Sequence, residues 1–202
     1  MKDLHGFIEI MGKLREGNPS AAASGFDVAF LAWLCAPENL NRDQILHLCL
    51  FSVFEKDIRK LSIIADSPQN TDICNIDTPE TNFVRFIRRE ESARAYPEAS
   101  LYIDRHRNEI FGILKDIHNL KRSGWLTHRV SHPESVAEHS CSLALSALLL
   151  TPQNMNRGKT VTMALLHDIQ EIRTGDFTPD DNISPEEKGR LEQNAIRKIA
   201  GD

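Results

Sequence analysis

Apolar residues recur along this chain mainly at the spacing of an α-helix, and the alternation typical of a strand is scarce. Start signals accompany several of these segments. The stretch "SPEE" from Ser184 combines a capping hydroxyl, a proline at the first helical position and a following acid, and "TPET" from Thr78 is a weaker version. The pattern predicts an all-α fold. Its helices are expected at residues 27–35, 42–58, 79–94, 99–121, 135–150, 157–172 and 185–199.

A stretch of the first half is similar to one of the second half without a gap. "DVAFLAWLCAPENLNRDQILHLCLFSVFEKD" aligns with "SLALSALLLTPQNMNRGKTVTMALLHDIQEI", which sets Asn41 opposite Asn156, a shift of 115 residues. This indicates a duplicated helical unit, or a chance match between two apolar helix pairs joined by a Pro/Asn turn. Under duplication the first copy is a scaffold without ligands. At this shift His139, His167, Asp168 and Glu171 lie opposite Ser24, Ser52, Val53 and Lys56.

Composition narrows the class of protein. A chain of 202 residues can bury a core without disulfides or structural metals. The formal net charge of -5 argues against a general binder of nucleic acid polymers, because such binding depends on Lys and Arg. The four cysteines, Cys35, Cys49, Cys74 and Cys141, form no CxxC pair and are expected to be reduced core thiols.

No apolar run approaches the roughly 18 residues of a membrane span, and the start "MKDLHGFIEI" does not have the layout of a signal peptide. We therefore expect a soluble, cytoplasmic protein that does not interact with a membrane.

Candidate chemistry concentrates in "ALLHDIQEIRTGD", residues 164–176. The adjacent His167 and Asp168 follow an apolar run, where an unpaired charge costs several kcal/mol. His139 lies early in the preceding predicted helix, and a short turn makes the two helices antiparallel neighbours, so the three side chains can converge. Imidazole nitrogen and carboxylate oxygen suit divalent ions. Glu171 and Asp176 have a simpler interpretation as a solvated helix end and a turn residue.

Four stretches, "PESVAEHS", "LLHDIQEI", "TGDFTPDD" and "LKRSGWLTHRV", resemble the HD-domain phosphohydrolase superfamily, in the branch that includes the 5′-deoxynucleotidases, over about residues 108–200. The resemblance implies a helical bundle that holds a divalent metal through a His, a His–Asp pair and a distant Asp. By this resemblance the metal ligands are His139, His167 and Asp168, Glu171 is catalytic, Asp176 contacts substrate, Trp125 lies beside the nucleotide pocket, and Arg122 and Arg129 are candidates for the phosphate.

The activity implied is metal-assisted hydrolysis of a phosphomonoester, such as a nucleoside monophosphate, with Glu171 orienting or deprotonating a water. An arginine would hold the non-bridging oxygens of the phosphate. The ligand types leave the metal open among Mn, Co, Mg, Zn, Fe and Ni.

The chain departs from the family at the fourth ligand, an Asp on a helix beyond the "SPEE" helix. The sequence stops at Asp202, so the second unit is expected to be truncated there. In the first copy, "YPEASLYIDRHRNEIF" resembles that helix and makes Asp104 its version of the ligand. Either Asp104 reaches the second unit's site, in the same chain or across a dimer, or the site has three protein ligands. The predicted units are a degenerate HD-like unit at 1–107, without metal ligands, and an HD domain at 108–202.

The sequence leaves two other functions open and predicts a dimer. The main alternative is a non-catalytic HD-fold scaffold, or a nucleotide-binding regulatory protein, with an incomplete metal site. A helical module for nucleic acid is disfavoured by the acidic balance. A homodimer is expected, because a truncated unit would leave apolar surface exposed.

Overall fold

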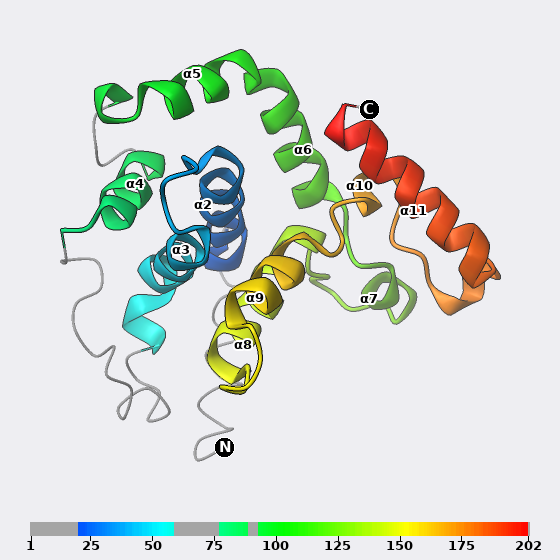
Figure 1. The fold of residues 1–202 in the computed structure, drawn as a ribbon. Helices are drawn as coiled ribbons and strands as arrows, with labels where there is room; N and C mark the ends of the chain where they lie inside the picture. Colours follow the sequence, from blue (N-terminus) through cyan, green and yellow to red (C-terminus); the bar gives the residue numbers. More distant parts are fainter. Residues whose placement is uncertain (1–19, 59–76, 89–92, 202) are drawn as a thin grey trace.

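The protein folds as a bundle of α-helices. Its computed structural model describes residues 20–58, 77–88 and 93–201, drawn in colour in Figure 1. Within those ranges the structure has an isolated antiparallel bridge between Lys121 and Ser135 but no strand, which confirms the all-α prediction. The helices are α2 (Ala21–Cys35), α3 (Arg42–Ile58), α4 (Pro79–Ile87), α5 (Pro97–Arg105), α6 (Arg107–Asn119), α7 (Ser123–Thr127), α8 (Val136–Leu150), α9 (Arg157–Leu166), α10 (Glu171–Thr174) and α11 (Pro185–Ala200), with 3-10 turns at Ala93–Ala95 and Pro179–Asp181.

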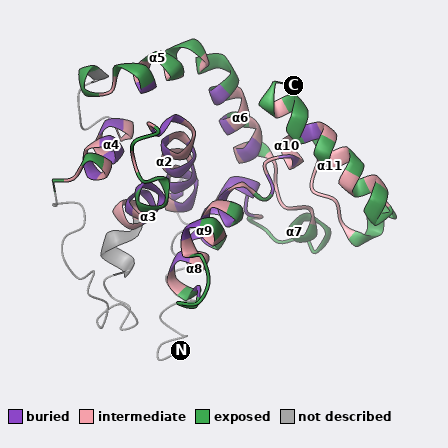
Figure 2. Cartoon of the chain, viewed as in Figure 1, coloured by how far each residue is buried: buried purple, intermediate pink, exposed green. Residues whose placement is uncertain are grey.

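Two helix pairs form the centre of the core, to which α4 and α6 add further buried side chains. Helix α2 packs with α3 and helix α8 with α9, and the pairs meet through α2 against α8 and α3 against α9. Figure 2 shows the buried residues of these helices. Burying a large apolar side chain contributes about 1.5–3 kcal/mol, and the buried residues form a continuous cluster, so both halves stabilise the same core. The largest fully buried side chains are Phe26, Phe83, Ile45, Leu46, Leu50, Ile117, Leu145 and Leu165.

The two helix pairs share their local structure. Helices α2 and α8 each have 15 residues, and they begin at Ala21 and Val136, positions related by the shift found in the sequence. Ser20 and Ser135 cap them through hydroxyls that accept a backbone N–H. Because Ser20 caps its helix, α2 begins earlier than the predicted residue 27.

The loops inside the two pairs also correspond. Asn41 and Asn156 cap α3 and α9 with their side-chain oxygens. Arg42 and Arg157 each donate from Nη2 to a backbone carbonyl six residues back, at 3.3 Å in both cases. A chance match of apolar positions does not predict shared caps and shared loop hydrogen bonds, so these contacts favour a duplication. The bounds of the two units, 1–107 and 108–202, stay a prediction.

The predicted helix 99–121 is instead two helices that meet at His106 (Figure 1). The ring of His106 lies against Tyr102, with centroids 4.5 Å apart, and its Nδ1 lies 2.8 Å from the Glu109 carboxylate. The bend separates the exposed α5, which buries Ala99, from α6, which buries Ile110, Leu114 and Ile117. Because α6 packs against α8, the bend brings the chain after α6 to the start of α8.

The end of α4 and one of the four cysteines fall at or beyond the limits of the described residues. Helix α4 ends at Ile87, and residues 89–92 of the longer predicted helix lie outside the described residues. Cys35, Cys49 and Cys141 are free and buried, as predicted, while Cys74 lies outside the described residues. Among the helices described, none has the length and apolar character needed to cross a membrane.

Candidate metal centre

His139 lies in the first turn of α8, whose start is held by contacts from both helix pairs. Ser135 accepts the N–H of Glu138, and the Glu138 carboxylate accepts the N–H of Ser135 in return at 2.8 Å. The hydroxyl of Ser20, which caps α2, donates to the other Glu138 oxygen at 2.6 Å. The first helix pair therefore helps to fix the turn that carries His139.

His167 and Asp168 lie in the turn directly after α9. The predicted continuous helix 157–172 is wrong, because α9 ends at Leu166 and Glu171 begins α10. In between, Ile169 N–H and Glu171 N–H donate to carbonyls three residues back, and Gln170 Nε2 donates to the His167 carbonyl at 2.8 Å. These bonds replace the i to i−4 bonds of an α-helix and turn the chain.

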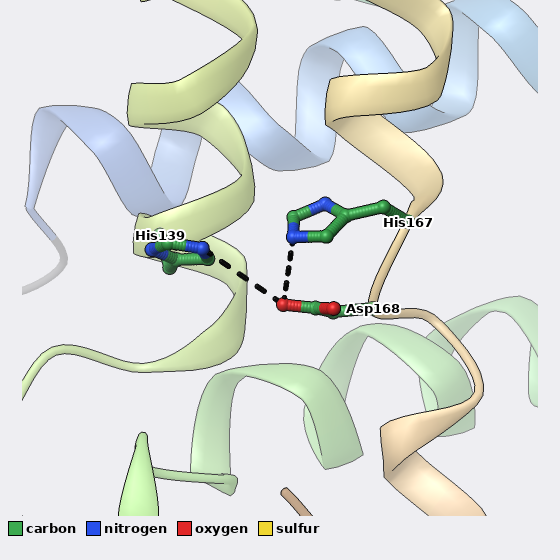
Figure 3. A group of neighbouring side chains, drawn as sticks. All are labelled: His139, His167 and Asp168. Carbon is green, nitrogen blue, oxygen red and sulfur yellow. Dashed lines mark ion pairs between the residues drawn. The ribbon is translucent and has the colours of Figure 1, made fainter. Parts of the chain in front are cut away.

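His139, His167 and Asp168 converge where the start of α8 meets the end of α9 (Figure 3). One ligand atom from each lies within 4.8 Å of the others. The Asp168 Oδ2 atom is 2.9 Å from His167 Nε2 and 3.9 Å from His139 Nε2. The structure therefore brings together the three residues that the resemblance suggests as metal ligands.

The hydrogen-bonding pattern of His167 fits a cation at this point. Its Nδ1 lies 2.9 Å from the Ala164 carbonyl, which can only accept, so Nδ1 carries the hydrogen. In the neutral ring, Nε2 then carries a lone pair that faces Asp168 Oδ2. Two hydrogen-bond acceptors only 2.9 Å apart repel each other unless a positive charge lies between them. A proton can supply it: burial lowers the pKa of His167, but the Asp168 carboxylate and the Ala164 carbonyl outweigh burial, so the pKa is raised. Two imidazole nitrogens and a carboxylate oxygen equally suit a divalent metal.

Arg122 connects this cluster to two further carboxylates. Its Nη1 donates to Asp168 at 2.9 Å, to both Glu171 oxygens at 3.3 Å and to Asp176 at 3.0 Å. The second Asp176 oxygen accepts the N–H of Ser123 at 2.6 Å. The carboxylate side chains are only 9–11% exposed, so Arg122 compensates three largely buried acids.

The carboxylates of this group have different proton affinities. Burial raises the pKa of Glu171 to about 8, Asp168 and Asp176 act in the same direction, and Arg122 opposes them. Burial alone would raise the pKa of Asp168, but the interactions with His167, Arg122 and His139 outweigh burial. The pKa of Asp168 is therefore lowered. Acids whose environments separate their pKa values in this way are typical of sites that transfer protons.

A pocket of about 380 Å³ lies beside the cluster, a size typical of small-molecule sites. Trp125, which is 42% exposed, forms part of its wall. The pocket therefore joins the candidate metal ligands to the candidate substrate-binding residues. Its lining residues are Arg122, Gly124, Trp125, His128, Glu134, His139, Asp176, Phe177, Thr178 and Pro179.

Two of the predicted site residues lie elsewhere. Arg129 is exposed just beyond α7, in left-handed backbone with φ of 54°, and is not among the lining residues. Asp104 lies on α5, its side chain is 59% exposed, and it binds Arg107 at 2.6 Å. The 13 residues of α6, about 20 Å of helix, separate Asp104 from Arg122. The structure does not bring Asp104 to the three ligands within one chain, and a contribution across a dimer stays a prediction.

Glu134 lines the same pocket but was not predicted as a site residue. It is 7% exposed, and its carboxylate accepts the indole N–H of Trp125 at 3.0 Å. A signal for it exists in the sequence, because an acid directly precedes the capping Ser135 and lies five residues before the candidate ligand His139. That signal alone does not show that the acid is buried beside the histidine.

Comparison with known proteins identifies the fold of the second half. Residues 114–202 match the family model described as HD domain. Among curated proteins, the 5′-deoxynucleotidase HDDC2 of Dictyostelium discoideum is 40% identical over 99 residues, 45% of this chain and 52% of that protein. The human 5′-deoxynucleotidase HDDC2 is 36% identical over 87 residues, 43% of each chain.

The 5′-deoxynucleotidase YGK1 of Saccharomyces cerevisiae is 32% identical over 125 residues, 62% of this chain and 54% of that protein. The chain thus spans about half the length of the curated relatives that it matches.

Proposed function

Since residues 114–202 belong to the HD domain family, in its 5′-deoxynucleotidase-like branch, we propose that this protein is a metal-dependent hydrolase of phosphomonoesters. The proposed substrates are nucleoside monophosphates, by analogy with the activity named for its relatives. The observation that carries the proposal is the convergence of His139, His167 and Asp168 beside a pocket that also contains Arg122 and Asp176.

Each residue of the site has a role that its chemistry supports. His139, His167 and Asp168 would hold the metal, whose identity is open among Mn, Co, Mg, Zn, Fe and Ni. When bound, a divalent ion supplies a Lewis acid for the phosphoryl oxygens. Glu171 in its ionised form would take the proton of the attacking water, and burial beside Asp168 and Asp176 raises the pKa of this carboxyl to about 8.

Arg122 and Trp125 would bind the substrate. All the carboxylate contacts of Arg122 run through Nη1, which leaves Nη2 and Nε for phosphate oxygens. Trp125 offers a ring face at the pocket wall, where a base or sugar can stack. Asp176 accepts hydrogen bonds from Arg122 and Ser123 and so holds the loop that carries both binding residues. Arg129 remains a candidate for the phosphate only if its exposed loop closes over a ligand.

The first helix pair would act as scaffold. It has Ser24, Ser52 and Val53 where the second pair has His139, His167 and Asp168, and it packs its apolar side against the second pair. A protein in which both pairs are scaffold, without catalysis, is the alternative. The metal content of the protein separates the two proposals.

We expect the purified protein to contain close to one divalent metal per chain and a His167→Ala, Asp168→Ala double variant to contain almost none. The reason is that the variant keeps one of three donors. Elemental analysis before and after dialysis against a chelator measures this, followed by reloading with manganese, cobalt or magnesium and assays on deoxynucleoside monophosphates.

The matched control is Asp104→Ala, because Asp104 is exposed and distant in the chain from the three donors. We expect it to retain metal. Loss of metal in this control would mean that Asp104 supplies the fourth ligand from a second copy. A parent protein that takes up no metal after reloading would favour the scaffold.

We further propose that the protein is a homodimer. Leu150 and Met163 are 41% and 61% exposed, whereas Cys35 and Leu48, at the equivalent positions of the first pair, are 7% and 3% exposed. Helix α4 packs on α3 and α2, while α11 packs on α10 instead. A sedimentation experiment is expected to give the mass of two chains, and a Met163→Glu variant to give the mass of one.

We also propose a cytoplasmic location, because three buried free thiols suit a reducing compartment.

A further inference from the structure

Glu134 lies between two residues of the site without being one of its candidate ligands. It precedes the cap of α8, and its side chain is 5% exposed. One of its oxygens, Oε1, accepts the Trp125 indole N–H at 3.0 Å and lies 3.4 Å from His139 Nδ1. Its backbone carbonyl accepts the N–H of Arg122 at 3.0 Å. The buried Glu134 thus contacts the candidate ligand His139, the pocket residue Trp125 and the backbone of Arg122.

We propose that Glu134 is the positioning residue of this metal site and that it fixes the tautomer and ring orientation of His139. The inference rests on the proposed function only in that the site binds metal. An ionised carboxylate only accepts hydrogen bonds, so the His139 nitrogen that faces it carries the hydrogen. The other nitrogen, Nε2, then keeps its lone pair, and it points toward Asp168 Oδ2, 3.9 Å away.

His167 also presents Nε2 to Asp168, but a different group binds its Nδ1. His167 Nδ1 is held by the Ala164 carbonyl, one turn earlier in its own helix. His139 lies in the first turn of α8, and its Nδ1 faces a side chain from the preceding loop. Both rings present Nε2 to the same point, one through backbone and one through Glu134. Partners of this kind orient metal-bound histidines, and removing them typically costs about 10–100-fold in metal affinity.

The contact with Trp125 gives Glu134 a second consequence. Because the same carboxylate oxygen is shared by the indole and the imidazole, the orientation of the pocket wall depends on the group that orients the ligand. A change at position 134 therefore alters both metal affinity and the position of the tryptophan ring. Tryptophan fluorescence of the metal-free protein reports the second effect independently of catalysis.

The test compares the parent with Glu134→Gln and with a matched control, Glu109→Gln. Glu109 also faces a histidine Nδ1, that of His106 at 2.8 Å, but on the exposed surface. Titration with manganese is expected to show about 10–100-fold weaker binding for Glu134→Gln and parent-like binding for Glu109→Gln. A thermal melt of each metal-free variant checks that Glu134→Gln remains folded.

The second readout is the tautomer of His139 in the metal-free protein, from long-range proton–nitrogen NMR correlations above the imidazole pKa. The parent is expected to show Nδ1–H at His139. The Gln variant is expected to lose that preference, because its amide can also donate. Equal manganese affinity of parent and Glu134→Gln, or Nε2–H at His139 in the parent, would overturn the inference. If the parent bound no metal, the proposed function would fail while the NMR result would still decide this inference.

Discussion

Replacing Glu171 with glutamine is expected to lower the rate of phosphomonoester hydrolysis by about 10²–10⁴-fold, the range typical of a lost general base. Glutamine keeps the shape of the side chain but neither takes nor releases a proton at neutral pH. Glu171 is not among the three clustered ligands, so the variant is expected to retain its metal. Single-turnover assays on a deoxynucleoside monophosphate, with metal content measured on the same samples, check both expectations.

Glu187→Gln is the matched control for this loss. Glu187 is a glutamate on α11 that pairs with Arg190 and does not line the pocket, so its change to glutamine removes a carboxylate outside the candidate site. We expect parent-like turnover. Should Glu171→Gln turn over at the parent rate while holding metal, Glu171 is not the proton acceptor and its role is structural.

Replacing Arg122 with methionine is expected to lower the free energy of unfolding of the metal-free protein by about 3 kcal/mol. Removing one partner of a buried ion pair costs about 3–5 kcal/mol, and we take the lower end because the Arg122 side chain is 25% exposed. The variant leaves three largely buried carboxylates without their shared cation. Urea unfolding in the presence of a chelator measures the difference.

A bound divalent ion would supply positive charge beside Asp168, so the loss in the Arg122→Met variant is expected to shrink when the protein is loaded with metal. Arg190→Met provides the control, since Arg190 pairs with a single exposed glutamate and its loss should leave the unfolding curve unchanged. An identical loss with and without metal would show that the metal does not bind next to this carboxylate group.

The helices were largely predictable because their determinants are local. Helix α8 matched the expected 135–150 within one residue, and α11 matched 185–199 closely. Both have a serine cap whose hydroxyl accepts a backbone N–H within the first turn. The predicted helix 99–121 was wrong at His106, because the side-chain contacts that accompany the bend and the packing of α6 on α8 are not encoded in apolar spacing.

The three clustered donors could also be anticipated, since a short turn between antiparallel helices brings the start of one beside the end of the other. The positions of these donor side chains relative to one another could not be predicted. The end of α9 at Leu166 depends on turn hydrogen bonds and on the Gln170 side chain, and this turn directs Asp168 toward His139. The placement of Asp104 away from the donors also required the structure.

By itself the sequence determined the helical class, and it predicted a repeated helix pair and a set of candidate metal ligands, because caps, periodicity and short turns act within a few residues. The tertiary structure alone decided that Arg122 compensates Asp168, Glu171 and Asp176, which lie 46, 49 and 54 residues away along the chain. It also decided that Glu134 lies between Trp125 and His139. These contacts depend on how loops pack onto helices, and that packing minimises buried unpaired charge across the whole site rather than within one segment.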